Sequence, residues 1–198
     1  TNITEAAGIS GRNAWCRGPD GSVYFVGPSG FFKLASNGTT VQDISETVWP
    51  QFFFNLDRSQ LYINLVYDHY HRGIWIYLAP INSDLGPISF LFYDLRAGGF
   101  WPQKFTNIGQ GNIANANPGP ISAIWYDGFS PAARYVVFGG YDGRLYVQSQ
   151  DEKSDIDIGA VTYAIEPSIT LGPIHPSDQE GLLVGTTFVF GEQAEAET

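Results

Sequence analysis

Residues 61–105 contain four short runs of β-branched and aromatic residues separated by chain breakers. The runs cover residues 61–70, 74–78, 88–95 and 100–105. Apolar side chains alternate along each run, so that Ile63, Leu65 and Tyr67 share one face. Alternation at period two predicts antiparallel strands joined by tight turns. We therefore expect a four-stranded meander in which both faces are at least partly apolar, and such a sheet needs neighbouring sheets to cover it.

The composition supports the same fold class along the whole chain. Aromatic residues make up 15% of the sequence and charged residues only 15%, while 23 glycines and 12 prolines lie mainly between the apolar runs. These proportions are typical of a turn-rich folded protein and not of a disordered one. The sequence predicts an all-β protein built from antiparallel four-stranded meanders.

Two further units of short strands flank the central one. We expect strands at residues 14–16, 23–26, 31–34 and 41–44 before it, and at 121–126, 135–138 and 144–148 after it. Asp20-Gly21, Asn37-Gly38, Asp127-Gly128 and Asp142-Gly143 predict the tight turns, because these residue types adopt positive φ at low cost. The sequence leaves open whether residues 52–54, in the link at 46–60, form a helical turn or a buried plug. It also predicts a long polar loop at 106–120.

The first and third units match each other in two registers. Residues 20–25 match residues 142–147, and residues 25–30 match residues 138–143. Repeats of four strands each are the sequence pattern of propeller blades. We expect residues 1–150 to form a propeller-like domain of about three blades, whereas a closed propeller needs about four to eight.

Residues 151–198 differ in texture from the preceding domain. A charged link at 151–157 precedes predicted strands at 160–171 and 182–190, which we assign to a closing blade or to the start of a following β domain. The chain begins at Thr1 and contains no methionine, so we expect it to be part of a longer or processed polypeptide.

Charge and cysteine content exclude several function classes. The net charge is −10 and the basic residues are scattered, which argues against tight binding of a phosphate backbone. Cys16 is the single cysteine, so we expect a small buried side chain and neither a disulfide nor a cysteine metal cluster. No apolar run approaches the roughly 20 residues of a membrane span. We expect no cofactor, no metal and no membrane span.

The segment Asp68-His69-Tyr70-His71 has the strongest chemical character. On a strand, His69 and His71 would share a face and could ligate a metal ion. Two ligands do not make a site, however, and the segment lies where a hairpin turn is expected. We favour a solvated turn or a partner contact over a metal site.

Four Tyr-Asp pairs raise the alternative of a propeller glycosidase, in which two carboxylates act on a glycosidic bond. They are Tyr67-Asp68, Tyr93-Asp94, Tyr126-Asp127 and Tyr141-Asp142. Most of these aspartates begin turns toward glycine, so turn capping explains them without catalysis. No nucleophile elbow, phosphate-binding loop or dinucleotide fingerprint is present in the sequence. We expect a protein that is not an enzyme.

Three stretches carry a resemblance to a known family. They are YDHYHRGIWIY at 67–77 with FYDLRAGGFW at 92–101, YFVGPSGFF at 24–32, and FGGYDGRLYV at 138–147. These stretches resemble propeller blades in the tail nozzle and hub (tail tubular) proteins of short-tailed bacteriophages. The resemblance covers residues 14–175 diffusely, and the chain has fewer blades than the family and lacks its flanking domains.

The resemblance implies a structural virion protein that forms a ring-like conduit for DNA in the phage tail and is made in the host cytoplasm. Its partners would be copies of itself and other tail proteins, while DNA would pass without specific binding along an acidic lumen. The residues that we expect to contact partners are His69, Tyr70, His71, Trp75, Tyr77 and Trp101.

Two alternatives remain beside this interpretation. In the first, the chain is a ligand- or glycan-binding propeller module that uses exposed Trp75, Tyr77 and Trp101 as stacking platforms. In the second, it is the propeller glycosidase described above.

Overall fold

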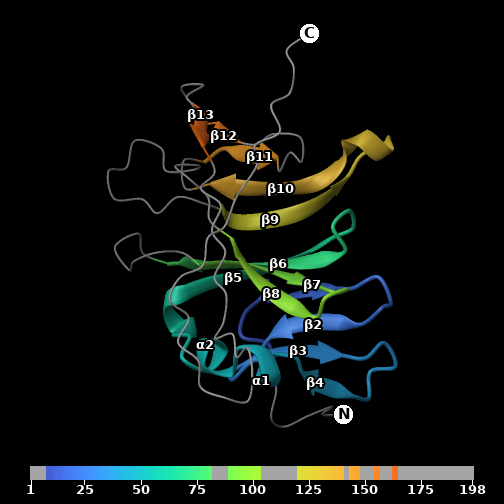
Figure 1. The fold of residues 1–198 in the computed structure, drawn as a ribbon, viewed down its shortest axis with the longest axis vertical. Coiled ribbons are helices and arrows are strands. Elements are labelled where there is room, and N and C mark those ends of the chain that lie inside the picture. Colours follow the sequence, from blue (N-terminus) through green and yellow to red (C-terminus); the bar gives the residue numbers. More distant parts are fainter. Residues whose placement is uncertain are drawn as a thin grey trace, which may run out of the picture. The chain divides into compact units, whose positions relative to one another are not determined.

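The computed structural model describes residues 8–81, 89–103, 120–140, 143–147, 154–156 and 162–164. In this part of the chain the secondary structure is mostly antiparallel β-sheet, with short helical segments. Three sheets carry the fold, and a two-stranded hairpin follows them along the chain (Figure 1). The all-β class that the sequence predicts is therefore confirmed.

The first sheet is a meander whose four strands pair in chain order. They are β1 (Trp15–Arg17), β2 (Val23–Val26), β3 (Phe31–Leu34) and β4 (Val41–Asp43). Each lies within one residue of its predicted position. Gly21 and Gly38 have φ of 80° and 71°, the left-handed conformation that glycine adopts without a Cβ penalty. The predicted Asp-Gly and Asn-Gly turns thus set the lengths of the strands.

Residues 45–60 contain both helical turns and a buried plug, which resolves the alternative left open by the sequence. Phe53 is fully buried, while the adjacent Phe54 is exposed. The Arg58 guanidinium donates hydrogen bonds to the carbonyl oxygens of Phe53, Leu56 and Gly27, so it ties this link to the first sheet. The helical segments are α1 (Ser45–Val48), α2 (Pro50–Phe54) and η1 (Arg58–Gln60).

The second sheet is the predicted central meander, again with its strands paired in chain order. The first strand ends at Asp68, two residues earlier than predicted, because the chain turns there and Asp68 pairs with Gly73. The second strand begins one residue before the predicted run 74–78 and continues two residues beyond it, to Pro80. The strands are β5 (Leu61–Asp68), β6 (Gly73–Pro80), β7 (Ser89–Asp94) and β8 (Gly99–Gln103).

The third sheet has three strands among the described residues, in the order β11-β10-β9. The strands are β9 (Pro120–Asp127), β10 (Arg134–Gly140) and β11 (Leu145–Val147), and η3 (Pro131–Ala133) precedes β10. Most of the predicted loop at 106–120 lies outside the described residues.

One of the two repeat registers corresponds to equivalent positions in the sheets. Residues 25–30 and 138–143 both lead from the second strand of a sheet into the turn before its third strand. The hydrogen bonds at these positions differ, because the Gly27 N–H donates forward to the Gly30 carbonyl at 2.8 Å, whereas the Gly143 N–H donates back to the Gly140 carbonyl at 3.1 Å. The other register aligns β2 with β11, which are the second and third strands of their sheets, so that match is not a structural repeat.

The segment at 151–157, which the sequence predicted to be a charged link, contains a short strand. β12 (Ser154–Ile156) pairs antiparallel with β13 (Thr162–Ala164), and Asp155 lies opposite Tyr163. The second strand falls within the predicted run at 160–171. The predicted strand at 182–190 lies outside the described residues.

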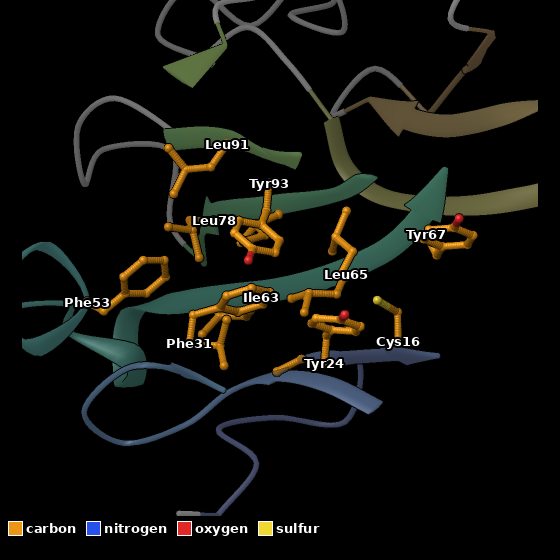
Figure 2. Close-up of a cluster of buried hydrophobic side chains, with 14 residues drawn as sticks. Cys16, Tyr24, Phe31, Phe53, Ile63, Leu65, Tyr67, Leu78, Leu91 and Tyr93 are labelled. Carbon is orange, nitrogen blue, oxygen red and sulfur yellow. The ribbon is translucent and has the colours of Figure 1, made fainter. Parts of the chain in front are cut away.

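A hydrophobic core fills the space between the first and second sheets (Figure 2). The ring of Phe31 lies at its centre, with ring centroids 6.1 Å from Phe53, 5.4 Å from Tyr93 and 5.6 Å from Phe100. The second sheet contributes the face that the sequence predicted from the alternation of Ile63, Leu65 and Tyr67. The buried members are Ala14, Cys16, Tyr24, Val26, Phe31, Phe53, Ile63, Leu65, Tyr67, Ile74, Ile76, Leu78, Leu91 and Tyr93.

A second core joins the opposite face of the second sheet to the third sheet. The second sheet is thus covered on both faces, and all eight residues of β6 are buried. Sheets buried on both faces have nearly continuous apolar strands, which explains the composition of this stretch. The members are Val66, Trp75, Tyr77 and Phe90 from the second sheet and Ala123, Val136 and Phe138 from the third.

Hydrogen bonds also connect the starts of successive sheets. The N–H of Leu65 donates to the carbonyl oxygen of Asn13 at 2.9 Å, just before β1. The N–H of Ala123 in β9 donates to Oδ1 of Asn64 in β5 at 3.2 Å. The first strand of each later sheet therefore lies beside the beginning of the sheet before it.

Candidate functional site

The turn between β5 and β6 holds the residues with the strongest predicted chemistry. Asp68 is buried, and its carboxylate accepts hydrogen bonds from the backbone N–H groups of Tyr70 (2.9 Å) and His71 (3.1 Å). It also accepts one from Trp75 Nε1 at 3.0 Å and contacts His71 Nδ1 at 2.6 Å. Burial raises the pKa of Asp68, but the hydrogen bonds from His71 and Trp75 outweigh it, so the pKa lies below its usual value.

The two histidines of this turn do not share a strand face. His69 lies against the rings of Tyr67 and Trp125, at centroid distances of 4.6 Å and 4.8 Å. His71 instead contacts the Asp68 carboxylate. The described residues contain no group of three or more His, Cys, Asp or Glu side chains that could hold a metal ion. The geometry is that of a turn capped by the buried Asp68 carboxylate, whereas the sequence favoured a solvated turn or a partner contact.

A small pocket lies between this turn and β10. Its volume is about 20 Å³, and its lining includes Asp68, His71, Trp125 and Arg134. A cavity of this size holds about one water molecule. The turn is thus a contact between the second and third sheets and has no room for an organic ligand.

Trp75 and Tyr77 are buried, so the expectation that they serve as exposed stacking platforms is wrong. Their exposed fractions are 5% and 0% because the third sheet covers this face of the second sheet. Their rings are stacked with 6.1 Å between centroids. Among the described residues, the Tyr77 hydroxyl has no hydrogen-bond partner.

Tyr70 and Trp101 remain accessible, with exposed fractions of 69% and 55%. Tyr70 lies in the β5–β6 turn, and Trp101 lies on the edge strand β8 opposite Phe92. Of the six residues predicted to contact partners, these two have the most exposed aromatic rings. His69 is exposed as well, and His71 is half-buried.

The other aspartates of the Tyr-Asp pairs also act locally. The Asp94 carboxylate accepts hydrogen bonds from the N–H groups of Arg96 and Ala97, and the bond from Arg96 lowers its pKa. Asp127 forms an ion pair with Arg134 at 2.7 Å. Asp142 lies outside the described residues. Turn capping is confirmed for Asp68 and Asp94, as the sequence predicted.

The sequence did not predict the outward face of the third sheet, the face that points away from the second. Cross-strand pairing places Val137 between Ile124 and Val147, and Tyr135 opposite Tyr126. Ile124 is 62% exposed, and Leu145, at the same face, is 78% exposed. The residues that make up this outward face are uncharged: Ser122, Ile124, Tyr126, Tyr135, Val137, Gly139, Leu145 and Val147. The alternation of side chains between the two sheet faces in residues 121–126 is the sequence signal from which this face could have been predicted.

A groove of about 760 Å³ opens between the first two sheets on the side of β4 and the β7–β8 turn. Tyr24 and Tyr93 form part of its wall, and Lys33 lies 5.4 Å above the Tyr24 ring. The other lining residues are Thr40, Val41, Gln42, Asp43, Ile44, Glu46, Thr47, Val48, Leu95 and Gly98. The first two sheets are therefore less tightly packed at β4 than at β1.

Sequence comparison does not identify a family for this chain. No model of a protein family matches the chain, and no curated protein matches it. Within the described ranges, no helix has the length and apolarity needed to cross a membrane. The arrangement of the three sheets is therefore the main indication of function.

Proposed function

We propose that the chain is part of a β-propeller with a structural, non-enzymatic role, and that its assembly is the tail nozzle or hub of a short-tailed bacteriophage. The observation that carries the proposal is the contact between successive first strands. β5 is hydrogen-bonded to Asn13, two residues before β1, and β9 is hydrogen-bonded to β5. In a propeller, the first strands of the blades surround a central channel.

The opposite side of the sheets supports the same arrangement. Blades that radiate from a channel move apart toward their last strands. The space between two neighbouring blades therefore widens there, and it is either filled by other residues or left open. Between the first two sheets, the connecting helices insert Phe53 against Phe31 and Phe100. Beyond this plug the groove beside β4 stays open. A parallel stack of sheets would need neither feature.

The state of the carboxylates supports a non-enzymatic role. Glycosidases need two carboxylates that face a substrate across the scissile bond. Here Asp68 is buried and occupied by its own turn and by Trp75, and Asp94 caps the β7–β8 turn. Asp127 is exposed but paired with Arg134. Among these three, each carboxylate is engaged by its own sheet.

The phage assignment depends on the blade resemblance and on charge. A net charge of −10 suits a conduit through which DNA passes without adhering, because like charges repel. The partners would be copies of this chain and other tail proteins, and the assembled location would be the virion. The exposed rings of Tyr70 and Trp101 are of the residue types that protein interfaces favour.

Native mass measurement and negative-stain electron microscopy of the purified, concentrated chain test this proposal. We expect a closed assembly with a central hole, and no retention of double-stranded DNA at physiological salt. A compact particle without a hole, or tight DNA binding, would contradict the conduit role.

A glycan-binding module is the second candidate, and the exposure of Trp101 favours it. If it is correct, a sugar will raise the melting temperature of the protein, and Trp101→Ala will abolish that shift. If the melting temperature stays unchanged across a broad sugar panel, this candidate is rejected.

A further inference from the structure

We propose that the outward face of the third sheet binds the first sheet of a second copy of this chain, so that two copies join head to tail. This inference deepens the proposed function and depends on its radial arrangement of sheets. It assigns a partner to a surface that the described residues leave uncovered.

The chemistry of the outward face fits a sheet partner. Antiparallel sheets with one face in water show polar residues on that face, whereas this one presents Ile124, Val137, Leu145 and Val147. None of the residues of the outward face is charged, although the chain carries a net charge of −10. Both existing contacts between sheets are made by faces of the same apolar and aromatic kind. The uncovered face therefore continues an established type of interface.

The outward face of the first sheet is the complementary surface. Register places Trp15, Phe25 and Phe32 together on the side opposite the core. Phe25 and Phe32 are stacked with 5.4 Å between centroids, and Trp15 beside them is 46% exposed. A large exposed aromatic ring beside a buried aromatic pair is the kind of anchor on which interfaces depend. Two charged residues share this face. Arg17 lies at the end of β1, where the rim of an interface tolerates charge, and Asp43 lies opposite Phe32 with its carboxylate occupied by hydrogen bonds from Ser45 Oγ and the Glu46 N–H.

The number of sheets favours a second copy as the partner. One chain supplies three such sheets among its described residues, and two chains supply six, which is within the about four to eight blades of closed propellers. The contact between the third sheet of one copy and the first sheet of the next would resemble the contact between the second and third sheets within one copy. An interface of this heterologous kind closes into a ring when the rotation per sheet fits.

The molar mass of the full chain over a dilution series, measured by light scattering after size exclusion, tests the inference. We expect the wild type to be a dimer. Ile124→Lys and Trp15→Lys should each raise the dissociation constant at least tenfold. Phe54→Lys is the matched control, because it places the same charge at an exposed aromatic position outside both faces. Far-UV circular dichroism identifies folded variants, and Leu145→Ser replaces Ile124→Lys if the latter does not fold.

Mixing two variants shows whether the association is head to tail. A mixed dimer of Trp15→Lys with Ile124→Lys keeps one unaltered interface, so mixing should restore association that neither variant shows alone. A wild-type monomer, a dimer that survives Ile124→Lys, or a mixture that stays monomeric overturns the inference. A monomer whose sheets still diverge from their first strands leaves the propeller proposal intact. Spin-label distances between the first and third sheets therefore distinguish failure of this inference from failure of the propeller proposal.

Discussion

Oδ1 of Asn64 in the second sheet accepts a hydrogen bond from the N–H of Ala123 in the third, at 3.2 Å. Asn64 is 8% exposed, so a polar side chain is buried in the middle of β5. A buried polar group at such a place requires a partner. The Asn64 side chain accepts from a backbone N–H of the next sheet and thereby fixes the relative position of β5 and β9.

Replacing Asn64 with leucine should therefore destabilise the protein although the side chain keeps a similar volume. The N–H of Ala123 loses its acceptor, and an unsatisfied buried group costs about 1–3 kcal/mol of unfolding free energy. Urea denaturation of Asn64→Leu and of a control variant measures the loss of stability. Asn55→Ala is the control, because Asn55 is exposed at the end of α2 and should change stability by about 0.5 kcal/mol or less. Equal midpoints for the two variants would contradict this role.

Asp68→Asn should cost about 1.5–3 kcal/mol, because hydrogen bonds to a buried charged acceptor are lost or weakened. In the wild type the Asp68 carboxylate accepts hydrogen bonds from two backbone N–H groups and from Trp75 Nε1. Asp127→Asn removes an exposed ion pair with Arg134 and should cost about 1 kcal/mol or less. A larger loss for Asp127→Asn than for Asp68→Asn would rule out the proposed capping of the turn.

The pH dependence of stability offers a second test of Asp68. The pKa of Asp68 in the folded protein lies below the ordinary value of 3.8. A carboxyl group with a lowered folded pKa stabilises the protein above the unfolded pKa, and that contribution disappears as the pH falls through the folded pKa. Between neutral pH and acidic pH below 3.8, the wild type should lose more stability than Asp68→Asn. Parallel pH profiles would contradict the pKa shift.

Tyr77→Phe should leave stability unchanged or raise it by about 1 kcal/mol. Within the described part of the chain its hydroxyl is buried without a hydrogen-bond partner, so removing it relieves a desolvation cost. Thermal and urea unfolding measure the change, with Tyr62→Phe at an exposed position as the control. Destabilisation by more than about 1 kcal/mol would mean that the hydroxyl has a partner, such as a buried water molecule.

Phe53→Ala should destabilise the protein by about 3–5 kcal/mol, because it removes a fully buried ring from the plug between the first two sheets. Its neighbour offers a close comparison. Phe54 is 70% exposed on the same helix, so Phe54→Ala should change stability by about 0.5 kcal/mol or less. Similar losses for both variants would mean that the plug is not the feature that holds these sheets together.

The sequence located the strands because two local signals agreed. Alternation marked the buried faces, and Asp-Gly and Asn-Gly pairs marked the turns whose glycines, such as Gly21 and Gly143, adopt positive φ. The strand that begins at Leu61 was predicted to continue to Tyr70, because His69 and Tyr70 also fit a strand pattern. In the structure the chain turns after Asp68. Local sequence patterns thus predicted the presence of the strands accurately, but they predicted the last residue of a strand less accurately.

The candidate site was harder to predict, because exposure depends on which sheet covers which face. Trp75 and Tyr77 have the residue types of a stacking platform, and only the packing of the third sheet shows that they are buried. Asn64 is a polar residue inside an apolar run, but it was not among the residues singled out from the sequence, and its partner is 59 residues away in the chain. Contacts between distant segments leave little trace in a single sequence.

The most direct test of the radial arrangement is a pair of distances between the first and third sheets, measured by pulsed electron paramagnetic resonance. One pair of spin labels, on Arg17→Cys and Tyr126→Cys, joins the first strands β1 and β9. The other, on Gln42→Cys and Val147→Cys, joins the last described strands β4 and β11. Cys16 should stay unlabelled, because burial raises its pKa to about 12. A clearly longer distance for the second pair is predicted, and equal distances would contradict the propeller arrangement.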